Sequence, residues 1–472
     1  MEIKKISSYE WKIAKEGRMK VPVVIYASEK LLEAMKQDIT LEQARNVACL
    51  PGIVEKSIVL PDAHQGYGFS IGGVAAFKLD TGIISPGGVG YDINCGVRLL
   101  TSNLKKSDIE SKKKEIINQL FRDVPSGVGK GGAIKITRDD IKEILEKGSE
   151  WAVKKGYGIK EDLERTEDNG CIKGAKAEDV SDRAIKRGLP QLGSLGAGNH
   201  FLEIQEVDEI YDKEIASKFE IKEKGQVTVM IHCGSRGLGH QVASDYIKLM
   251  EDKYGWKNLP DRELINAPIN SELGKKYLSA MAAAANFGFC NRQMIMQWVR
   301  DSFNKIFGKV KLDLIYDVAH NVAKIEEHNV NGKMTKLCVH RKGATRSFGP
   351  GRKELPEIYR KTGQPILLPG SMGTASYLLV GTEKAEELTF ASTAHGAGRS
   401  CSRTSASKNL RGEDIKQELE KKGIEIKAGS WKGLVQEAPQ AYKDIDEVAK
   451  VSDEVGLGKL VARLKPIAVM KG

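Results

Sequence analysis

Short runs of apolar and β-branched residues, each bounded by glycine, proline or polar residues, predict strands along most of the chain. These runs lie at residues 23–26, 58–60, 226–231, 312–318, 337–340, 365–368 and 377–380. A glycine-rich segment before Phe201 is expected to lead into a further strand. The pair Asn331-Gly332 is typical of a two-residue hairpin turn, so we expect a hairpin whose second strand contains residues 337–340.

Other segments repeat apolar residues every three or four positions, which predicts helices. Ser28 is the expected N-cap of a short helix that ends near Met35. Thr40 and Gln43 have the spacing of a capping box at the start of a second helix. Further helices are expected at residues 107–122, 139–147, 237–254 and 272–306.

The longest predicted helix, residues 272–306, is rich in alanine and methionine. Its internal polar residues, Asn286, Asn291 and Arg292, can face either the site or solvent, and we expect solvent. The predicted strands and helices interleave along the chain. No internal repeat or low-complexity linker marks a domain boundary.

The composition of this 472-residue chain fits a globular protein without membrane spans. Hydrophobic residues make up 40%, and no apolar run approaches the ~18 residues of a spanning helix. The first residues lack an apolar segment, so no secretory signal is expected. Seven cysteines without any C-x-x-C pair favour free thiols in a reducing, cytoplasmic compartment. The net charge of +11 is compatible with a polyanionic partner, although a lysine-rich surface is commonly only solvated.

Asp92 and Cys95 lie three residues apart in a glycine-dense loop, and the simple interpretation is a turn aspartate beside a buried cysteine. Three histidines change that interpretation, because His200, His232 and His320 lie at predicted strand ends or in glycine-rich turns. The five side chains offer one oxygen, one sulfur and three nitrogens, which suit Zn, Fe, Co or Mn²⁺. Five donors exceed the three ligands of a usual catalytic ion, so we expect two ions with a shared ligand, best supplied by Cys95. The alternative is that each histidine is a hydrogen-bonded core or turn residue.

His395 is the candidate nucleophile. It opens the loop His-Gly-Ala-Gly-Arg, and Arg399 and Arg403 follow about one and two helical turns later. An imidazole nitrogen can attack phosphorus and form a phosphoramidate, and arginine can hold phosphate through two hydrogen bonds. The chain lacks the Lys-x-Asp-Gly motif of lysine-dependent nucleotidyl transferases. The alternative for His395 is a helix cap or metal ligand, and His64 fits either a cavity or a surface turn.

Residues 127–132 match the pattern G-x-G-x-x-G. They follow Val-Pro-Ser rather than a clear strand, and no dinucleotide-binding unit surrounds them. The lysine in this segment is followed by glycine rather than serine or threonine. We therefore reject both the dinucleotide-binding and the P-loop interpretation of this segment.

A series of long motifs, in order along the chain, closely resembles the RtcB family of RNA-splicing ligases. The motifs are Pro-Asp-Ala-His-Gln-Gly (61–66), Gly-Tyr-Asp-Ile-Asn-Cys-Gly-Val-Arg (90–98), Gly-Ala-Gly-Asn-His-Phe (196–201), His-Cys-Gly-Ser-Arg-Gly (232–237), Asp-Val-Ala-His-Asn (317–321), His-Arg-Lys-Gly-Ala-Thr-Arg (340–346), Pro-Gly-Ser-Met-Gly (369–373), His-Gly-Ala-Gly-Arg (395–399), Glu-Ala-Pro-Gln-Ala-Tyr (437–442) and the final Lys-Gly. The resemblance implies one mixed α/β core over residues 1–472, with a central cavity for metal and nucleotide.

The resemblance also implies a GTP- and Mn²⁺-dependent ligase. It would join RNA with a 2′,3′-cyclic phosphate or 3′-phosphate to RNA with a 5′-hydroxyl, in tRNA splicing or RNA repair. His395 would attack the α-phosphate of GTP and become guanylylated. The GMP would pass to the RNA 3′-phosphate, forming RNA-(3′)pp(5′)G, and the 5′-hydroxyl would then expel it. Asp92, Cys95, His200, His232 and His320 match the family's ligands for two Mn²⁺ ions.

The positions that match the family's guanylate contacts are Asn199, Phe201, Glu203, His320, Asn321, Pro369, Gly370, Ser371, Met372, Ser376, His395, Gly396, Ala397, Gly398, Tyr442 and Lys471. We assign Arg236, Arg399 and Arg403 to the terminal RNA phosphates, on charge and position. The partners implied are RNA, as tRNA exon halves or broken RNA, and an archease-type activator protein. No membrane is expected as a partner, and the ligase is expected to act as a monomer or homodimer in the cytoplasm.

Two other classes of protein fit some of these residues. A dinuclear metallohydrolase of nucleotides or RNA ends would use His395 only as an acid or base and would form no covalent guanylate. A non-catalytic RNA-binding protein is the second alternative. The intact Asp92, Cys95 and His395 speak against a decayed site.

Overall fold

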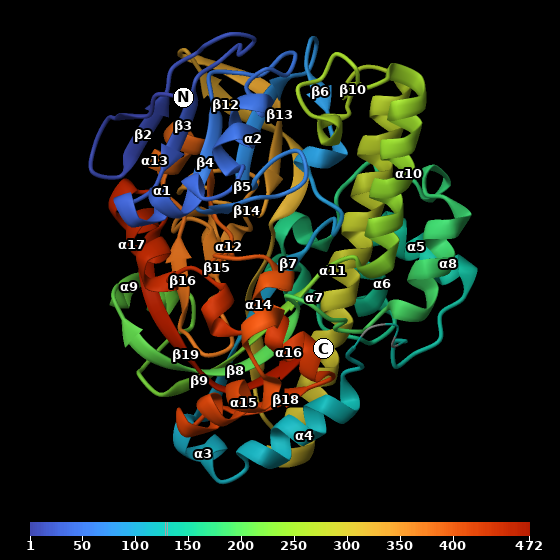
Figure 1. Cartoon of the computed structure of the whole chain (residues 1–472). Helices are drawn as coiled ribbons and strands as arrows, with labels where there is room; N and C mark the ends of the chain where they lie inside the picture. Colours follow the sequence, from blue (N-terminus) through green and yellow to red (C-terminus); the bar gives the residue numbers. More distant parts are fainter. Residues whose placement is uncertain (128, 130) are drawn as a thin grey trace.

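The computed structural model describes residues 1–127, 129 and 131–472, and describes residues 408 and 409 by their backbone alone. Val128 and Lys130 of the glycine-rich segment lie outside the described residues, so the rejection of both nucleotide motifs there stays a prediction. The described chain forms two large sheets beside a group of helices (Figure 1). This confirms the mixed α/β fold.

The first sheet has seven strands in the order β1-β2-β3-β4-β5-β13-β12. Its strands are β1 (Lys4–Lys5), β2 (Glu10–Ile13), β3 (Val23–Tyr26), β4 (Ser57–His64), β5 (Ile71–Lys78), β13 (Lys333–Lys342) and β12 (Asn321–Val330). The predicted hairpin is confirmed, because β12 and β13 pair directly across a turn at Asn331 and Gly332. Both turn residues have positive φ, 51° and 83°, as a two-residue hairpin turn requires.

The second sheet has eight strands, seven of them in the order β11-β7-β9-β8-β19-β16-β15, with β18 paired to β19. Its strands are β11 (Leu312–Ala319), β7 (Gly96–Lys105), β9 (Gln226–Cys233), β8 (Phe201–Ile210), β19 (Lys459–Lys471), β16 (Ser376–Val380), β15 (Pro365–Leu368) and β18 (Glu425–Ala428). Two small sheets pair β6 (Ile83–Ile84) with β10 (Ala267–Pro268) and β14 (Ala344–Arg346) with β17 (Ser392–Ala394). The chain passes from the second sheet to the first between β11 and β12, at His320.

The helices surround these sheets, and Figure 1 shows α10 and the 36-residue α11 side by side. The helices are α1 (Glu29–Lys36), α2 (Thr40–Val47), α3 (Lys106–Glu110), α4 (Lys113–Asp123), α5 (Arg138–Lys147), α6 (Ser149–Lys154), α7 (Lys160–Glu164), α8 (Asp182–Gly188), α9 (Lys213–Lys218), α10 (Arg236–Tyr254), α11 (Glu272–Phe307), α12 (Glu357–Arg360), α13 (Glu383–Thr389), α14 (Arg403–Asn409), α15 (Gly412–Lys421), α16 (Trp431–Gln436) and α17 (Ile445–Val455). Within the described part of the chain, none of them is long and apolar enough to cross a membrane.

Two helix predictions are wrong in detail. Thr40 is the first residue of α2 rather than its cap, and Asp38 accepts the Thr40 backbone N–H at 2.7 Å. Gln43 does not complete a capping box, because its side-chain amide bonds both backbone groups of Gly66, at 2.7 and 3.0 Å. The helix predicted at 107–122 is two helices, α3 and α4, separated by a turn at the exposed residues Ser111 and Lys112.

The polar residues inside α11 do not face solvent, contrary to the prediction. Asn286, Asn291 and Arg292 are all fully buried. Arg292 forms a buried ion pair with Asp317 on β11, with Nη2 2.7 Å from Oδ1. Helical periodicity indicates which face of a helix carries the apolar residues. It does not reveal that a polar residue has an ion-pair partner on a strand distant in the sequence.

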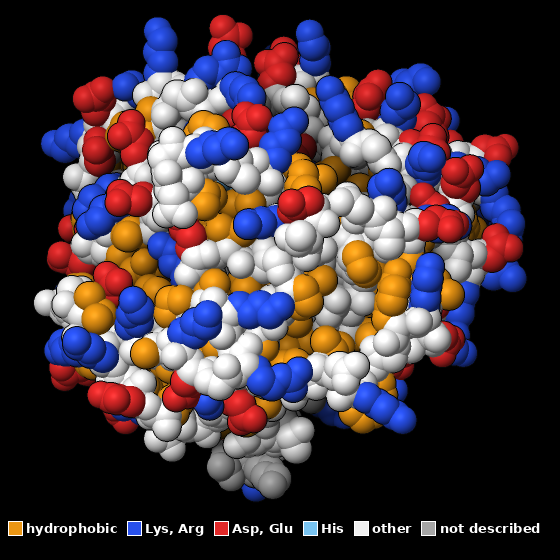
Figure 2. Space-filling model, turned by 90° about the horizontal axis from the view of Figure 1, so that it is seen from above, with side chains coloured by type: hydrophobic (Ala, Val, Ile, Leu, Met, Phe, Trp, Pro, Cys, Tyr) orange, Lys and Arg blue, Asp and Glu red, His pale blue; other side chains and the backbone are white. Residues whose placement is uncertain are grey.

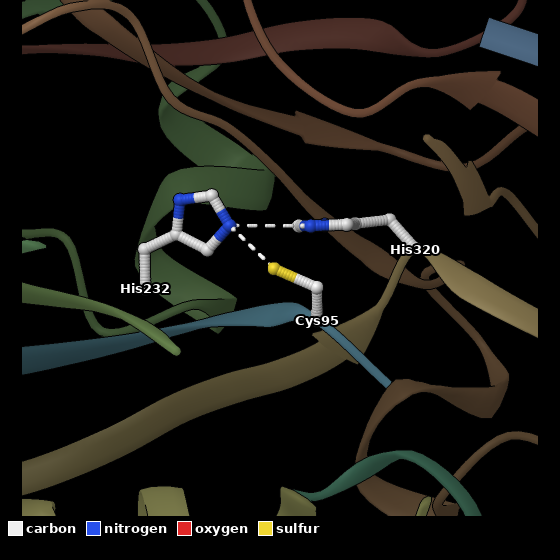
Figure 3. A group of neighbouring side chains, drawn as sticks. All are labelled: Cys95, His232 and His320. Atoms are coloured by element: carbon white, nitrogen blue, oxygen red, sulfur yellow. Dashed lines mark hydrogen bonds between the residues drawn. The ribbon is translucent and has the colours of Figure 1, made fainter. Parts of the chain in front are cut away.

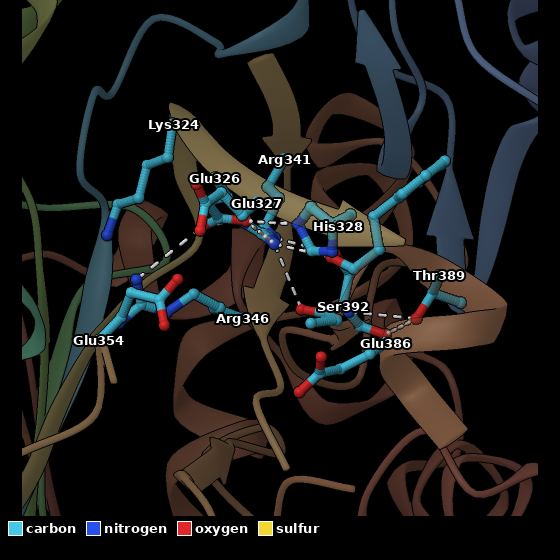
Figure 4. Close-up of polar contacts among 12 residues, drawn as sticks. Lys324, Glu326, Glu327, His328, Arg341, Arg346, Glu354, Glu386, Thr389 and Ser392 are labelled. Carbon is cyan, nitrogen blue, oxygen red and sulfur yellow. Dashed lines mark hydrogen bonds and ion pairs between the residues drawn. The ribbon is translucent and has the colours of Figure 1, made fainter. Parts of the chain in front are cut away.

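A buried network of charged side chains connects β12 and β13 with β17 (Figure 4). Glu326 accepts hydrogen bonds from two guanidinium nitrogens of Arg341, at 2.9 and 2.7 Å, and pairs with His328 at 3.1 Å. Arg341 Nε also donates to Ser392 Oγ on β17, at 2.8 Å. Burial alone would raise the pKa of Glu326, but Arg341 and the other donors hold it well below its usual value. The network therefore fixes the strand that leads directly into His395.

Glu326→Gln should destabilise the protein by about 3 kcal/mol, because it leaves the buried Arg341 without its countercharge. The midpoint of urea unfolding checks this. Glu327→Gln, at the neighbouring and more exposed position, should change the free energy of unfolding by less than about 0.5 kcal/mol. Equal midpoints for the two variants would contradict the assignment.

Candidate metal and nucleotide site

The ends of neighbouring strands bring four of the predicted donors to one edge of the second sheet. Cys95 directly precedes β7 and His200 precedes β8, whereas His320 follows β11 and His232 lies near the end of β9. These strands are antiparallel neighbours, so the starts of β7 and β8 lie beside the ends of β9 and β11. Phe201 pairs directly with His232. The sheet topology thus gathers residues that are far apart in the sequence.

Cys95, His232 and His320 form the first donor group (Figure 3). Figure 3 shows the three side chains pointing toward one another from separate segments. Cys95 Sγ lies 3.2 Å from His232 Nε2, and that nitrogen lies 3.2 Å from His320 Nε2. All three side chains are buried.

Asp92, Cys95 and His200 form the second donor group. His200 Nε2 lies 2.9 Å from Asp92 Oδ2 and 3.5 Å from Cys95 Sγ. The donor atoms of each group lie within 4.8 Å of one another. Because Cys95 belongs to both groups, one sulfur atom joins them.

These donor atoms fit cations better than they fit hydrogen bonds. His200 Nδ1 lies 3.0 Å from the Leu195 carbonyl oxygen and donates to it, so in the absence of a cation a second ring hydrogen on Nε2 is shared with Asp92, and a cation would replace that hydrogen. In the contact between His232 Nε2 and His320 Nε2, only one nitrogen can donate. Asp92 Oδ1 is buried without a hydrogen-bond partner among the described residues. A cation in each group would use these lone pairs.

The thiol and the carboxylate differ in how readily they bind a cation. Burial and the nearby Asp92 carboxylate raise the pKa of Cys95 to about 12. Burial alone would raise the pKa of Asp92, but the hydrogen bond with His200 lowers it to about 2. Asp92 is therefore ready to bind a cation, whereas Cys95 binds one as it loses a proton.

Arg292 and Asp317 hold the donor loops in place, a role that the sequence did not predict. Arg292 Nη1 donates to the carbonyl oxygens of Asn94 and Cys233, both at 2.8 Å. These carbonyls are next in the chain to Cys95 and His232. The one signal in the sequence was an arginine inside an otherwise apolar helix.

His395 follows β17 and lies beside the first donor group, with its ring centroid 5.0 Å from that of His320. Its Nδ1 lies 2.5 Å from Asp62 Oδ2, and the same oxygen accepts the His395 backbone N–H at 2.9 Å. The carboxylate places the ring hydrogen on Nδ1 and leaves a lone pair on Nε2. Asp62 lies in β4 and is fully buried. Its contact with His395 was not predicted, although Asp62 belongs to one of the motifs.

One cavity of about 830 Å³ contains all five metal-donor residues and His395 in its wall. His64 also lines it, which decides between the two positions left open for that residue. Most of the predicted guanylate positions line it as well, namely Asn199, Phe201, His320, Asn321, Pro369, Gly370, Ser371, Met372, His395, Gly396, Ala397, Gly398, Tyr442 and Lys471. Glu203 and Ser376 are not in the cavity wall. Glu203 bonds Gln205 at 2.7 Å, and Ser376 Oγ accepts the Gly370 N–H at 3.2 Å.

Two buried groups near this cavity have pKa values close to neutrality. Burial raises the pKa of Glu203 to about 8. Burial lowers the pKa of Lys471, whose Nζ lies 5.6 Å from the Phe201 ring centroid, to about 8. Each group can therefore change its protonation when a ligand binds near neutral pH.

Positive side chains dominate the polar lining of the cavity. Its lysines and arginines are Arg187, Arg236, Lys342, Arg399, Arg403, Lys432 and Lys471, against the carboxylates Asp92 and Glu437. Buried Glu437 pairs with Arg399 at 3.4 Å and with Arg403 at 3.0 Å, and Arg236 Nε donates to Ser194 Oγ at 3.4 Å. On the face shown in Figure 2, by contrast, Lys and Arg are interspersed with Asp and Glu. The excess of positive charge in the cavity suits phosphate groups.

The sequence profile described as "tRNA-splicing ligase RtcB" matches residues 43–472. A protein of Archaeoglobus fulgidus named tRNA-splicing ligase RtcB is 54% identical to this chain, over 100% of the chain and 99% of the relative. A Nanoarchaeum equitans protein of the same name is 54% identical over 100% of both chains. The Thermococcus kodakarensis protein of that name is 53% identical over 100% of this chain and 99% of its own.

Proposed function

We propose an RNA-joining function for this chain because it belongs to the RtcB family of tRNA-splicing ligases. Membership supports RNA ligation in tRNA splicing. In finer detail, we propose that the chain uses GTP to join RNA 2′,3′-cyclic phosphate or 3′-phosphate ends to 5′-hydroxyl ends. RNA repair is a second setting in which the same chemistry would serve.

His395 is the proposed nucleophile. Its Nε2 attacks the α-phosphorus of GTP, forming an N–P bond as the bond to pyrophosphate breaks. An oxygen of the RNA 3′-phosphate then attacks the same phosphorus and releases the imidazole. In the last step the RNA 5′-hydroxyl attacks the 3′-phosphorus, and GMP leaves. A 2′,3′-cyclic phosphate first requires water to open it at the bond to O2′.

One observation carries this proposal: Asp62 occupies His395 Nδ1, and the lone pair of Nε2, beside the first donor group, has no hydrogen-bond partner among the described residues. A histidine that only caps a helix or packs in the core would not be expected to have a buried carboxylate on one ring nitrogen and a cavity beside the other. The alternation of donor and acceptor on the ring is the arrangement that a nucleophilic imidazole requires.

The two donor groups are the proposed sites of two Mn²⁺ ions. Asp92, Cys95 and His200 would hold one ion, and Cys95, His232 and His320 the other. When bound, the ions would supply positive charge to offset the negative charge that develops on the phosphoryl oxygens.

The guanylate and the RNA are proposed to bind around His395. The loop at residues 369–372 lines the cavity and can offer backbone groups and the Ser371 hydroxyl, and Lys471 and Tyr442 line it too. Arg236, Arg399 and Arg403 are the proposed contacts for the terminal RNA phosphates. Glu203 and Ser376 do not line the cavity, so their proposed contacts with the guanylate require the loop at residues 369–372 to move.

The assembly around the chain also remains a proposal. We propose a single domain over residues 1–472, a monomer or homodimer, and an archease-type activator as partner. All seven cysteines are unpaired, which favours the reducing cytoplasm as the location.

The test of the proposed function is incubation with α-labelled GTP and Mn²⁺, followed by peptide mapping. We expect one GMP per chain, on the peptide that contains His395, in a bond that acid breaks and alkali spares. A metallohydrolase would instead release labelled nucleotide without retaining it. Label on another residue, or none under any metal, would overturn the proposal.

Asp62→Asn should slow guanylylation by about 10²- to 10⁴-fold with little change in KM for GTP. The asparagine oxygen can still accept both the Nδ1 hydrogen and the His395 backbone N–H, but the neutral amide no longer stabilises the positive charge that the ring gains as Nε2 attacks phosphorus. Single-turnover labelling at several GTP concentrations separates the two constants. Asp80→Asn, at an exposed turn, is the control and should behave as wild type. A rise in KM alone would show that Asp62 serves binding and does not orient the ring.

A further inference from the structure

Three aromatic rings lie in a row at the cavity wall, outside the segments proposed to hold the guanylate. The Tyr67 and Tyr91 rings meet edge to face, with centroids 6.0 Å apart. The Tyr91 ring is nearly parallel to that of His240, with a 5.9 Å centroid separation and a 20° angle. All three residues line the 830 Å³ cavity.

Tyr67, at the outer end of this row, has an exposed ring and a backbone that is held by a hydrogen bond. Tyr67 is 64% exposed, and no described residue forms a hydrogen bond with its hydroxyl. The buried Lys342 Nζ donates to the backbone carbonyl of Tyr67 and, at 3.1 Å, to that of Gly87. Because its backbone is already held, Tyr67 loses little backbone freedom when a flat ligand stacks on its ring.

The position of the row indicates which flat ligand fits. Tyr91 is next in the chain to Asp92, so the row begins beside the second donor group. The cavity whose wall contains both the row and His395 has a positive lining. A ligand that is aromatic at one point and anionic along its length is a single-stranded nucleic acid, whose bases stack on exposed aromatic side chains.

We propose that Tyr67, Tyr91 and His240 form a stacking platform for an unpaired nucleobase close to the RNA end that is being joined. This inference rests on the proposed ligase function and adds a base-binding site to it. The platform reads a ring face and not a hydrogen-bonding edge, so it accepts any of the four bases. It requires the last nucleotides of one RNA strand to be unpaired and turned out of a helix.

The test measures RNA binding by the full-length protein with two short single-stranded probes. One probe ends in a 3′-phosphate and the other begins with a 5′-hydroxyl, and each carries fluorescent 2-aminopurine near that end. For one of the probes we expect quenching on binding and a Kd about tenfold higher in Tyr67→Ala. Tyr67→Phe, which keeps the ring, should restore wild-type binding.

Two controls separate stacking from other effects. Tyr254→Ala removes a tyrosine that is 39% exposed on α10 and does not line the cavity, and it should bind as wild type. An abasic probe should bind wild type and Tyr67→Ala equally, because it has no base to stack. The probe that responds identifies which RNA end uses the platform.

The outcomes distinguish this inference from the proposed function. If wild type binds and joins RNA but Tyr67→Ala is unchanged with both probes, the platform is wrong and the ligase proposal stands. If Tyr67→Ala weakens the binding of abasic probes as much as the binding of probes that carry the base, Tyr67 acts without stacking, and the platform is again overturned. If wild type neither retains GMP nor binds either probe, both proposals fail together.

Discussion

His395→Ala is expected to abolish retention of GMP and to reduce the joining of 3′-phosphate RNA by at least about 10⁴-fold. The substitution removes the nitrogen whose lone pair Asp62 leaves free. No other described histidine has a carboxylate bonded to Nδ1, because the carboxylate contacts of His200 and His328 are both on Nε2. Retained label in a GTP incubation and product formation from two RNA strands measure the two effects.

A chemical bypass provides the control for His395→Ala. RNA that already carries the (3′)pp(5′)G end no longer needs the nucleophile. The variant should therefore join this activated RNA to a 5′-hydroxyl strand at a rate close to that of wild type. Failure with activated RNA would mean that the variant is misfolded or that His395 also acts in the last step, and the nucleophile assignment would lose its main support.

Cys95→Ala is expected to remove metal from both donor groups at once. The Cys95 sulfur belongs to both groups, whereas each histidine belongs to one. We expect the metal content after dialysis against Mn²⁺ to fall from two ions to fewer than one per chain. Ligation should fall by about 10³-fold, more than the 10- to 100-fold typical of residues that only support a ligand.

Two variants put this expectation in context. Cys171→Ala removes a half-buried thiol whose hydrogen bonds in the described structure go to backbone carbonyls, and it should keep both ions and full activity. His200→Ala removes a donor of the second group alone and should keep one ion. If Cys95→Ala also kept one ion, the sulfur would not be shared, and the two sites would be independent.

Local pattern was sufficient for several strands, although β2 and β5 were not predicted. Val23–Tyr26 and Pro365–Leu368 have the predicted bounds. A run of β-branched or apolar residues bounded by turn residues indicates a strand without reference to any distant residue. The Asn331-Gly332 hairpin was equally local. Gln43 shows the limit: its spacing to Thr40 suggested a cap, but the backbone of Gly66 is its actual partner. Partners that are distant in sequence override local preference wherever they satisfy a polar group better.

The sequence by itself selected the side chains that we propose carry the chemistry: Asp92, Cys95, the three histidines and His395 were all chosen from residue type and neighbourhood. Tertiary structure alone decided how they meet. Antiparallel neighbours bring the starts of β7 and β8 beside the ends of β9 and β11, and no local pattern records that pairing. The same is true of Asp62, which lies 333 residues before His395 and defines its tautomer, and of the Tyr67 row. Contacts at such separations depend on the fold as a whole. The sequence around a residue indicates its own strand or loop, but it does not indicate which distant residue will lie beside it.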